Sequence, residues 1–193
     1  MRDHKTGFSG ATWLTVTVAY VATYSMTNGF FTPLENILAP NIPSNVSLMF
    51  IPHGVRVLTF YFFGLWGYLY LAPVVWVMWA LEVYGQSNDG YLSIGIFISL
   101  FACHFGVEIC KRLFQTNGKQ GGLGFNWKQL LAAGTIGSLL NSTGLTWLYN
   151  STFEPLTFAG YLFGDVAGQF FLMLLLIFFF RLASRSTAIT DRV

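Results

Sequence analysis

The feature that most constrains this chain is a series of six apolar segments, each about long enough to cross a bilayer. A hydrocarbon core about 30 Å thick needs about 20 mainly apolar residues per helix. Segments of about that length occur at 11–31, 46–64, 65–84, 91–110, 127–149 and 155–180. Only 9% of the 193 residues are charged, whereas soluble domains carry roughly 25% because their surface faces water. The sequence therefore predicts an all-α fold, a single polytopic bundle of about six transmembrane helices over residues 1–193.

The second and third segments follow each other almost without a linker. Their combined run from 46 to 84 is about twice the length of one crossing. Gly64 and Gly67 stand near its middle, and two glycines so close together are typical of a tight turn. We therefore predict two helices joined by a short turn.

The charges between the segments predict how the bundle is oriented. The connection at 111–128 and the residues after 180 carry seven cations: Lys111, Arg112, Lys119, Lys128, Arg181, Arg185 and Arg192. The connections on the other side carry only acidic charges, at Glu35, Glu82, Asp89 and Glu154. Cytoplasmic loops carry an excess of Lys and Arg, so both termini are expected on the cytoplasmic side. The net charge of +2 and the absence of any recognition motif argue against nucleic-acid binding.

Five ionisable residues fall inside the apolar segments: His53, Arg56, His104, Glu108 and Asp165. Such residues are costly in a bilayer and are candidate functional positions by default. Arg56 and Asp165 each lie about 10 residues from the outer end of their helix, which places both near the midplane at about 1.5 Å per residue. We expect a salt bridge between them. It is either a structural clamp or part of a ligand or ion site.

The remaining ionisable residues have other expected roles. His104 and Glu108 are four residues apart and share a helix face, so we interpret Glu108 as approaching the interface near Lys111 and Arg112 rather than as part of a proton relay. His53 follows Pro52, where an early break in the helix would expose backbone carbonyls to a cavity. A haem between His53 and His104 fits poorly, because their depths differ by about 9 Å. No third ligand has a spacing that supports a metal site, and we predict no cofactor.

Small and neutral polar residues mark the last two segments. Gly160, Gly164 and Gly168 form a stripe of small residues at four-residue spacing, which lets helices approach closely within membranes. We expect the stripe to serve internal packing rather than dimerisation. Asn141 and Gln169 can hydrogen-bond across helices or contact a ligand, and Ser142 and Thr143 have the same potential.

The sequence provides no set of catalytic residues. The Gly164-Asp165 pair is similar to part of the intramembrane aspartyl protease motif, but that chemistry needs two aspartates sharing a proton. Asp165 is the only aspartate inside a predicted helix. No nucleophile elbow or His-Glu-x-x-His motif occurs either. The two cysteines, Cys103 and Cys110, lie about 10 Å apart along one helix, beyond disulfide reach. We therefore expect a protein that is not an enzyme.

Two motifs resemble a known family. Residues 47–58 (SLMFIPHGVRVL), with the following 64–73 (GLWGYLYLAP), and residues 160–168 (GYLFGDVAG) are similar to bacterial membrane-associated sensor domains of the MASE type, especially that of the hexose-phosphate sensor kinase. The resemblance matches Pro52, Gly54 and Arg56 to one motif and Gly164, Asp165 and Gly168 to the other, over about a quarter of the chain. It implies a multi-pass protein of the bacterial inner (cytoplasmic) membrane. Members of that family usually carry an output domain, and here we expect a stand-alone relative.

We therefore expect a non-catalytic, sensor-like membrane module or a subunit of a larger membrane complex. Its partners would be the lipid bilayer, a protein in the membrane and a small-molecule ligand. The alternative is a small solute transporter, or a substrate-binding membrane subunit of one, because six helices in about 190 residues suit that class too. A membrane enzyme is a third and weaker alternative.

Overall fold

The computed structural model describes residues 8–40, 46–83, 90–115, 127–149 and 153–190, and within these ranges the regular structure is helical, with no strand. The prediction of an all-α fold is confirmed. The elements in chain order are α1 (Gly10–Met26), the π-helical turn η1 (Thr27–Phe31), α2 (Thr32–Leu38), α3 (Pro52–Phe63), α4 (Trp66–Val83), α5 (Gly90–Gln115), α6 (Trp127–Tyr149) and α7 (Pro155–Thr190).

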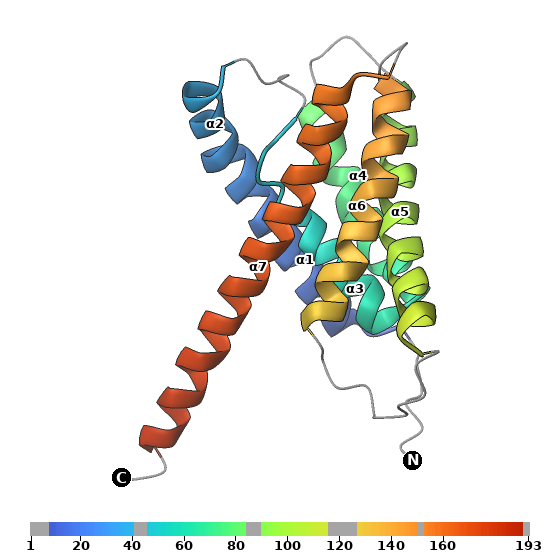
Figure 1. Ribbon diagram of the computed structural model, residues 1–193. Coiled ribbons are helices and arrows are strands. Elements are labelled where there is room, and N and C mark those ends of the chain that lie inside the picture. The colour runs from blue at the N-terminus through green and yellow to red at the C-terminus, as the bar shows by residue number, and fades with distance from the viewer. Residues whose placement is uncertain (1–7, 41–45, 84–89, 116–126, 150–152, 191–193) are drawn as a thin grey trace.

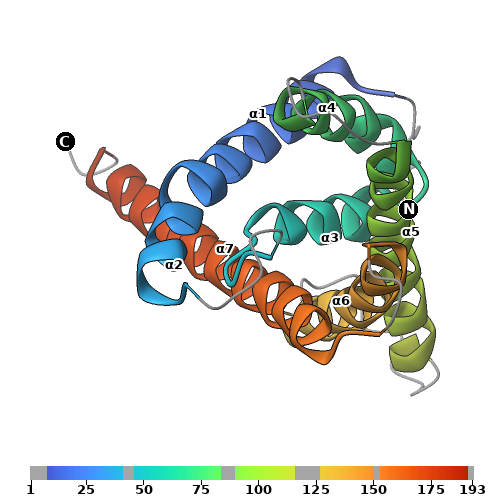
Figure 2. The same ribbon diagram turned by 90° about the horizontal axis from the view of Figure 1, so that it is seen from above.

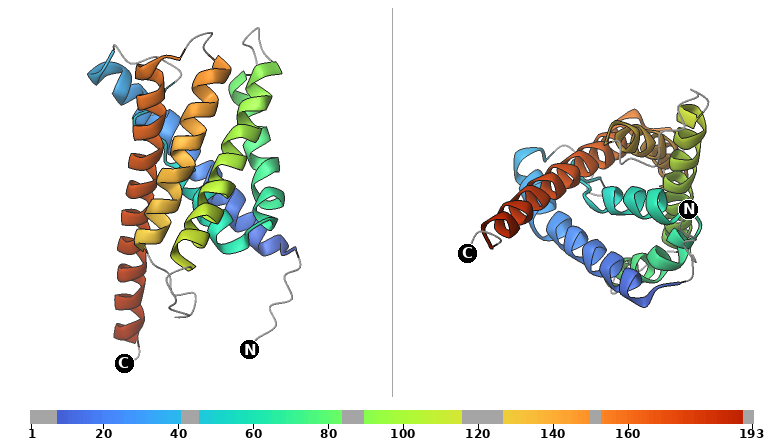
Figure 3. Two further views of the ribbon diagram at one scale, coloured as in Figure 1. Left: turned by 45° about the vertical axis from the view of Figure 1, so that its right-hand side comes forward. Right: turned by 90° about the horizontal axis from the view of Figure 1, so that it is seen from below.

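The helices form a bundle with α3 at its centre (Figures 1 and 2). Helix α3 packs against α1, α4, α5, α6 and α7, whereas α1 packs mainly on α4, and α5 on α6. Successive long helices run in alternating directions, so that α1 begins and α7 ends at the same end of the bundle (Figure 1). Figure 3 shows that α1 crosses the bundle obliquely and that α7 continues past the ends of α5 and α6.

Two stretches of the described helices are long and apolar enough to cross a membrane. They are Ile94–Phe114 in α5 and Pro155–Leu182 in α7. Helix α4 contains a shorter apolar stretch, Trp66–Leu81. Long apolar helices of this kind are what the sequence predicted for these segments.

The observed boundaries differ most from the predicted ones in the first third of the chain. The predicted helices at 65–84 and 127–149 agree closely with α4 and α6, and α5 and α7 both run further than 91–110 and 155–180. Residues 32–38, which the sequence left outside any helix, form α2. The first helix reaches α2 through η1, because Gly29 and Pro33 are tolerated within this turn and at the start of the next helix.

The second predicted helix, 46–64, begins six residues late. Residues 46–51, here called the entry segment, are not helical, and α3 starts only at Pro52. Proline suits the first turn of a helix because its missing N–H would have no partner there, and it disfavours a helical residue before it. At 12 residues, α3 is about 18 Å long, so it starts inside the bundle rather than at its end (Figure 1).

The predicted turn between the second and third segments is confirmed. Gly64 has a φ of 54°, which lies in the left-handed region that favours glycine. Its N–H donates to the carbonyl of Phe60, and α4 begins two residues later at Trp66. The turn returns the chain towards the other end of the bundle.

Candidate functional site: a buried polar network around Asp165

The entry segment lies in a groove along α7 that the glycine stripe forms. A Cβ atom on Gly160 would overlap the side chain of Val46, and one on Gly164 would overlap the carbonyl of Ser47. At Gly168 it would overlap the backbone of Phe50. The stripe therefore accommodates an extended piece of the same chain rather than a second helix, although the expectation of internal packing is met.

Side chains from two other elements satisfy the backbone of the entry segment. Glu35 of α2 accepts a hydrogen bond from the N–H of Leu48 at 3.0 Å. Thr27 of η1 accepts one from the N–H of Ile51 at 3.3 Å and donates to the carbonyl of Met49 at 3.4 Å. The N–H of Phe50 donates to the carbonyl of Gly164 at 2.9 Å. Buried non-helical backbone needs such partners, which explains why η1 and α2 are folded over this segment.

The extended geometry changes which residues meet inside the bundle. An extended chain advances about 3.3 Å per residue and a helix about 1.5 Å, so six extended residues carry the chain about 11 Å further. His53, rather than Arg56, consequently lies beside Asp165. Its Nδ1 is 3.3 Å from Oδ2 of Asp165, and the two side chains are 0% and 4% exposed.

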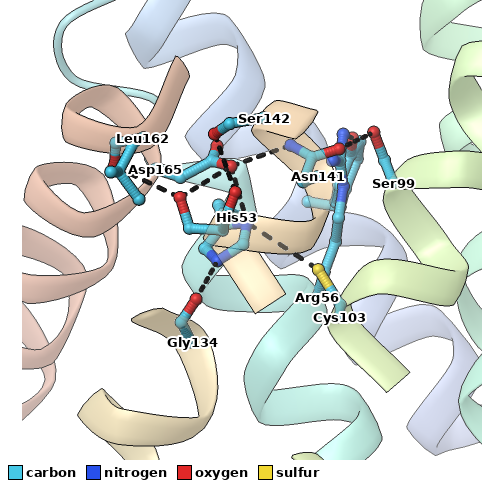
Figure 4. A network of polar contacts seen from close by, with 11 residues as sticks. His53, Arg56, Ser99, Cys103, Gly134, Asn141, Ser142, Leu162 and Asp165 are labelled. Carbon is cyan, nitrogen blue, oxygen red and sulfur yellow. Dashed lines mark hydrogen bonds and ion pairs between the residues drawn. The ribbon is translucent and has the colours of Figure 1, made fainter. Parts of the chain in front are cut away.

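His53 and Asp165 are the centre of a network that joins four helices (Figure 4). Nε2 of His53 lies 3.2 Å from the carbonyl oxygen of Gly134 in α6. Sγ of Cys103 in α5 lies 3.7 Å from Nδ1 of the same ring. Asn141 of α6 donates from Nδ2 to Oδ2 of Asp165 at 2.8 Å.

Serines extend the network on both sides of Asn141. Oγ of Ser99 in α5 donates to Oδ1 of Asn141 at 2.8 Å. Oγ of Ser138 lies 3.4 Å from Oδ2 of Asp165 and 3.2 Å from the carbonyl of Leu162. Ser142 donates to the carbonyl of Ser138 at 2.7 Å. The side chains therefore tie α5 to α6 and α6 to α7.

The hydrogen-bond inventory assigns protons within this network. A backbone carbonyl can only accept, so Nε2 of His53 carries a proton towards Gly134. Oδ2 of Asp165 already accepts from Asn141, which suits an ionised carboxylate. A second proton on Nδ1 then completes an imidazolium–carboxylate pair. Buried charges of this kind persist where they are paired and hydrogen-bonded.

The predicted salt bridge between Arg56 and Asp165 is wrong as a contact, because Asp165 pairs with His53. Arg56, which is 6% exposed, donates instead from an Nη atom to the hydroxyl of Tyr20 in α1 at 2.7 Å. Its Cζ lies 5.6 Å from the centre of the Tyr20 ring and 5.1 Å from that of Phe50. Its Nε has no hydrogen-bond partner among the described residues. Two aromatic faces and one hydroxyl thus hold this cation, and cation–π contacts of this kind are favourable when desolvated.

The other predicted site residues lie apart from the network. Gln169 is buried and donates to the carbonyl of Leu130 at 2.8 Å, which joins α7 to α6 one turn beyond Asp165. His104 contacts the rings of Phe60 and Tyr68 on the other side of α5. Glu108 pairs with Lys111 at 3.1 Å, the kind of cationic neighbour that the sequence suggested for it. Within the described ranges, no three His, Cys, Asp or Glu side chains are grouped to hold a metal ion.

Sequence reasoning missed several members of the site. They are Tyr20, Thr27, Ser99, Cys103 and Ser138. Each is a small polar or amphipathic residue of a kind that occurs often in apolar helices, so its identity alone carried no signal. The missing information was the end of the helix at Pro52, which decides the level at which each helix presents its polar groups.

The arrangement is suited to binding and structural coupling rather than to covalent chemistry. Its only nucleophilic atom among the described residues of the network, Sγ of Cys103, is fully buried. The one strong base, Asp165, is occupied by His53 and Asn141. Comparisons of the chain with protein-family models, with curated proteins and with solved structures found no match.

Proposed function

We propose that this chain is a multi-pass membrane protein whose buried polar network makes it a non-catalytic, sensor-like module or a subunit of a larger membrane complex. The observation that carries the proposal is the His53–Asp165 pair, buried where the helical part of α3 begins. Ionisable groups inside a bundle are expensive and mark ligand or ion sites in membrane proteins. A break in a helix at the same level adds free backbone polarity.

The surface of the bundle supports placement in a membrane. Large apolar side chains are exposed along the outer faces of the long helices, among them Leu14, Val18, Leu69, Trp76, Phe97, Phe101, Phe163 and Phe170. Contiguous apolar surface of this extent is rare on proteins that face water. It suits lipid contact.

The order and direction of the helices support six crossings with both ends inside. Helix α5 ends and α6 begins at the end of the bundle where α1 begins and α7 ends (Figure 1). Lys111 and Arg112 belong to the last turns of α5, and Lys128 to the first turn of α6. Glu154 lies at the opposite end, just before α7. This asymmetry agrees with the excess of cations in cytoplasmic loops.

Helix α7 supports a role in coupling to a partner. Its membrane-length stretch ends at Leu182, but the helix continues to Thr190. The same helix carries Asp165 and the glycine groove, so a change in the network or the entry segment would move its far end. A continuous helix is a suitable mechanical link between a buried site and a protein at the membrane surface.

The first experiment is purification of the wild-type chain and Asp165→Asn in mild detergent, with mass spectrometry of everything that co-purifies. We expect a stoichiometric protein or a small molecule with the wild type and less of it with Asp165→Asn. Glu154→Gln is the matched control, because it removes a carboxylate outside the network. Wild-type protein that carries nothing would contradict the module and subunit roles.

Orientation is tested independently by single cysteines at Glu154 and Lys128, in a chain whose buried Cys103 and Cys110 are replaced by serine. A membrane-impermeant maleimide added to intact cells should label the cysteine at 154 and not the one at 128. Labelling of both positions, or of position 128 alone, would contradict the six-crossing arrangement.

The alternative function, a small solute transporter or its substrate-binding subunit, is favoured by one observation. Helix α3 begins inside the bundle, and discontinuous helices of this kind form the midplane sites of many transporters. Uptake of the co-purified small molecule into liposomes, abolished by Asp165→Asn, would establish that function in place of the sensor role. Binding without uptake would exclude it.

A further inference from the structure

A pocket outside the network lies on the outer face of α5, beside the turn between α3 and α4. Its volume is about 420 Å³, and it is lined by Leu65, His104, Phe105, Glu108, Ile109 and Arg112. None of these residues contributes to the network around Asp165. The pocket is therefore a separate candidate site.

The polar side of the pocket is a ridge at helical spacing. His104, Glu108 and Arg112 are four residues apart in sequence, so they follow one another along one face of α5. The carboxylate of Glu108 is engaged by Nζ of Lys111 at 3.1 Å. Since one anion faces two cations, the local charge of Glu108, Lys111 and Arg112 is positive, and the last turns of α5 favour an anionic ligand.

The other side of the pocket is apolar and open to the surroundings. Leu65, Phe105 and Ile109 are 71%, 52% and 39% exposed. Phe105 and Ile109 continue the outer face of α5 away from its cationic end. A ligand that covers both parts must carry a negative head and a hydrocarbon tail.

We propose that this pocket binds an anionic phospholipid, with the phosphate of the headgroup at Arg112 and an acyl chain along Phe105 and Ile109. The inference rests on the membrane placement proposed above, in which this end of α5 reaches the cytoplasmic leaflet. Cationic pockets on that side of membrane proteins are suited to anionic headgroups. Arginine matches the geometry of a phosphate better than lysine does, because its planar fork can donate two parallel hydrogen bonds.

The test uses the full chain in mild detergent and native mass spectrometry with phosphatidylglycerol or phosphatidylcholine of identical acyl chains. We expect phosphatidylglycerol to bind more tightly, and Arg112→Gln to weaken its binding about fivefold, because one cation near an anionic lipid surface contributes about that factor. Arg181→Gln is the matched control. It removes an exposed arginine from the corresponding end of α7, outside the pocket, and should leave the binding unchanged.

Two further arms keep the result interpretable. Glu108→Gln removes the competing carboxylate and should strengthen phosphatidylglycerol binding while leaving the pocket intact. Inorganic phosphate in excess should fail to displace the lipid, and displacement would overturn the lipid as occupant in favour of a free phosphate. Equal losses in Arg112→Gln and Arg181→Gln would overturn the pocket.

Failure of this inference is distinct from failure of the proposed function. A chain that inserts with the expected cysteine labelling, but binds both lipids equally, retains its six crossings and loses only the pocket. A chain that lacks the expected labelling loses the placement on which the pocket depends.

Discussion

Replacing Gly164 by alanine tests whether the glycine stripe exists to hold the entry segment. The added Cβ would overlap the carbonyl of Ser47, which is backbone and cannot swing aside as a flexible side chain would. The same glycine accepts the hydrogen bond from the N–H of Phe50 at 2.9 Å. A single methyl group therefore acts on both the packing and the hydrogen bonding of residues 46–51.

The size of the effect follows from three contributions. Forcing an extra methyl group into a packed interior costs about 1–3 kcal/mol. Separating Phe50 from its acceptor leaves a buried N–H unsatisfied, at about 1–3 kcal/mol. Alanine in place of glycine within a helix offsets about 1 kcal/mol of this. We expect Gly164→Ala to lower the free energy of unfolding by about 2–4 kcal/mol.

The assay is reversible unfolding of the purified protein in mixed micelles, followed by circular dichroism. Gly29→Ala is the control, because a Cβ at that position meets no atom within 4 Å. It should leave stability unchanged or raise it slightly. Gly168→Ala, whose Cβ would overlap the backbone of Phe50, should resemble Gly164→Ala.

One result would refute the reasoning. If Gly164→Ala and Gly168→Ala were as stable as Gly29→Ala, the stripe would not carry the entry segment, and the explanation of how His53 reaches Asp165 would fail with it.

Two further hydroxyl groups are predicted to matter, each with a matched control. Tyr20→Phe removes the acceptor of Arg56 and should destabilise the protein by about 1.5–3 kcal/mol, whereas Tyr68→Phe should not, because that hydroxyl is buried without a partner; equal melting temperatures for both variants would contradict this. Thr27→Val removes both hydrogen bonds to the entry segment and should cost about 1–3 kcal/mol in the same unfolding assay, with Thr143→Val, an exposed position, near neutral.

Much of the helical architecture followed from the sequence alone. Apolar length placed α4 and α6 closely, because in a long uniform segment no local signal competes with helix formation. Gly64 and Gly67 placed the turn between α3 and α4, where a positive φ demanded glycine. These features depend on local chemistry, which the sequence carries in full.

The entry segment could not be predicted in the same way. Residues 46–51 are as apolar as a helix, and the groove that holds them lies more than 100 positions later in the chain, along α7. Their backbone partners, Thr27 and Glu35, come from a turn and a helix that the sequence left unassigned. Pro52 was the available signal, and its meaning as a helix start rather than a kink depended on these tertiary contacts.

The misplaced partner of Asp165 follows from that single error and leads to a decisive measurement. Reading residues 46–64 as one helix set Arg56 level with Asp165, whereas an extended start moves His53 into that place. Removing Asp165 alone should cost about 3–5 kcal/mol, because its buried partner is left unpaired. In double-mutant cycles, the coupling of His53→Ala with Asp165→Ala should reach about 1–3 kcal/mol and exceed that of Arg56→Ala with Asp165→Ala. A larger coupling to Arg56 would restore the helical reading of 46–51 and remove the entry segment from the fold.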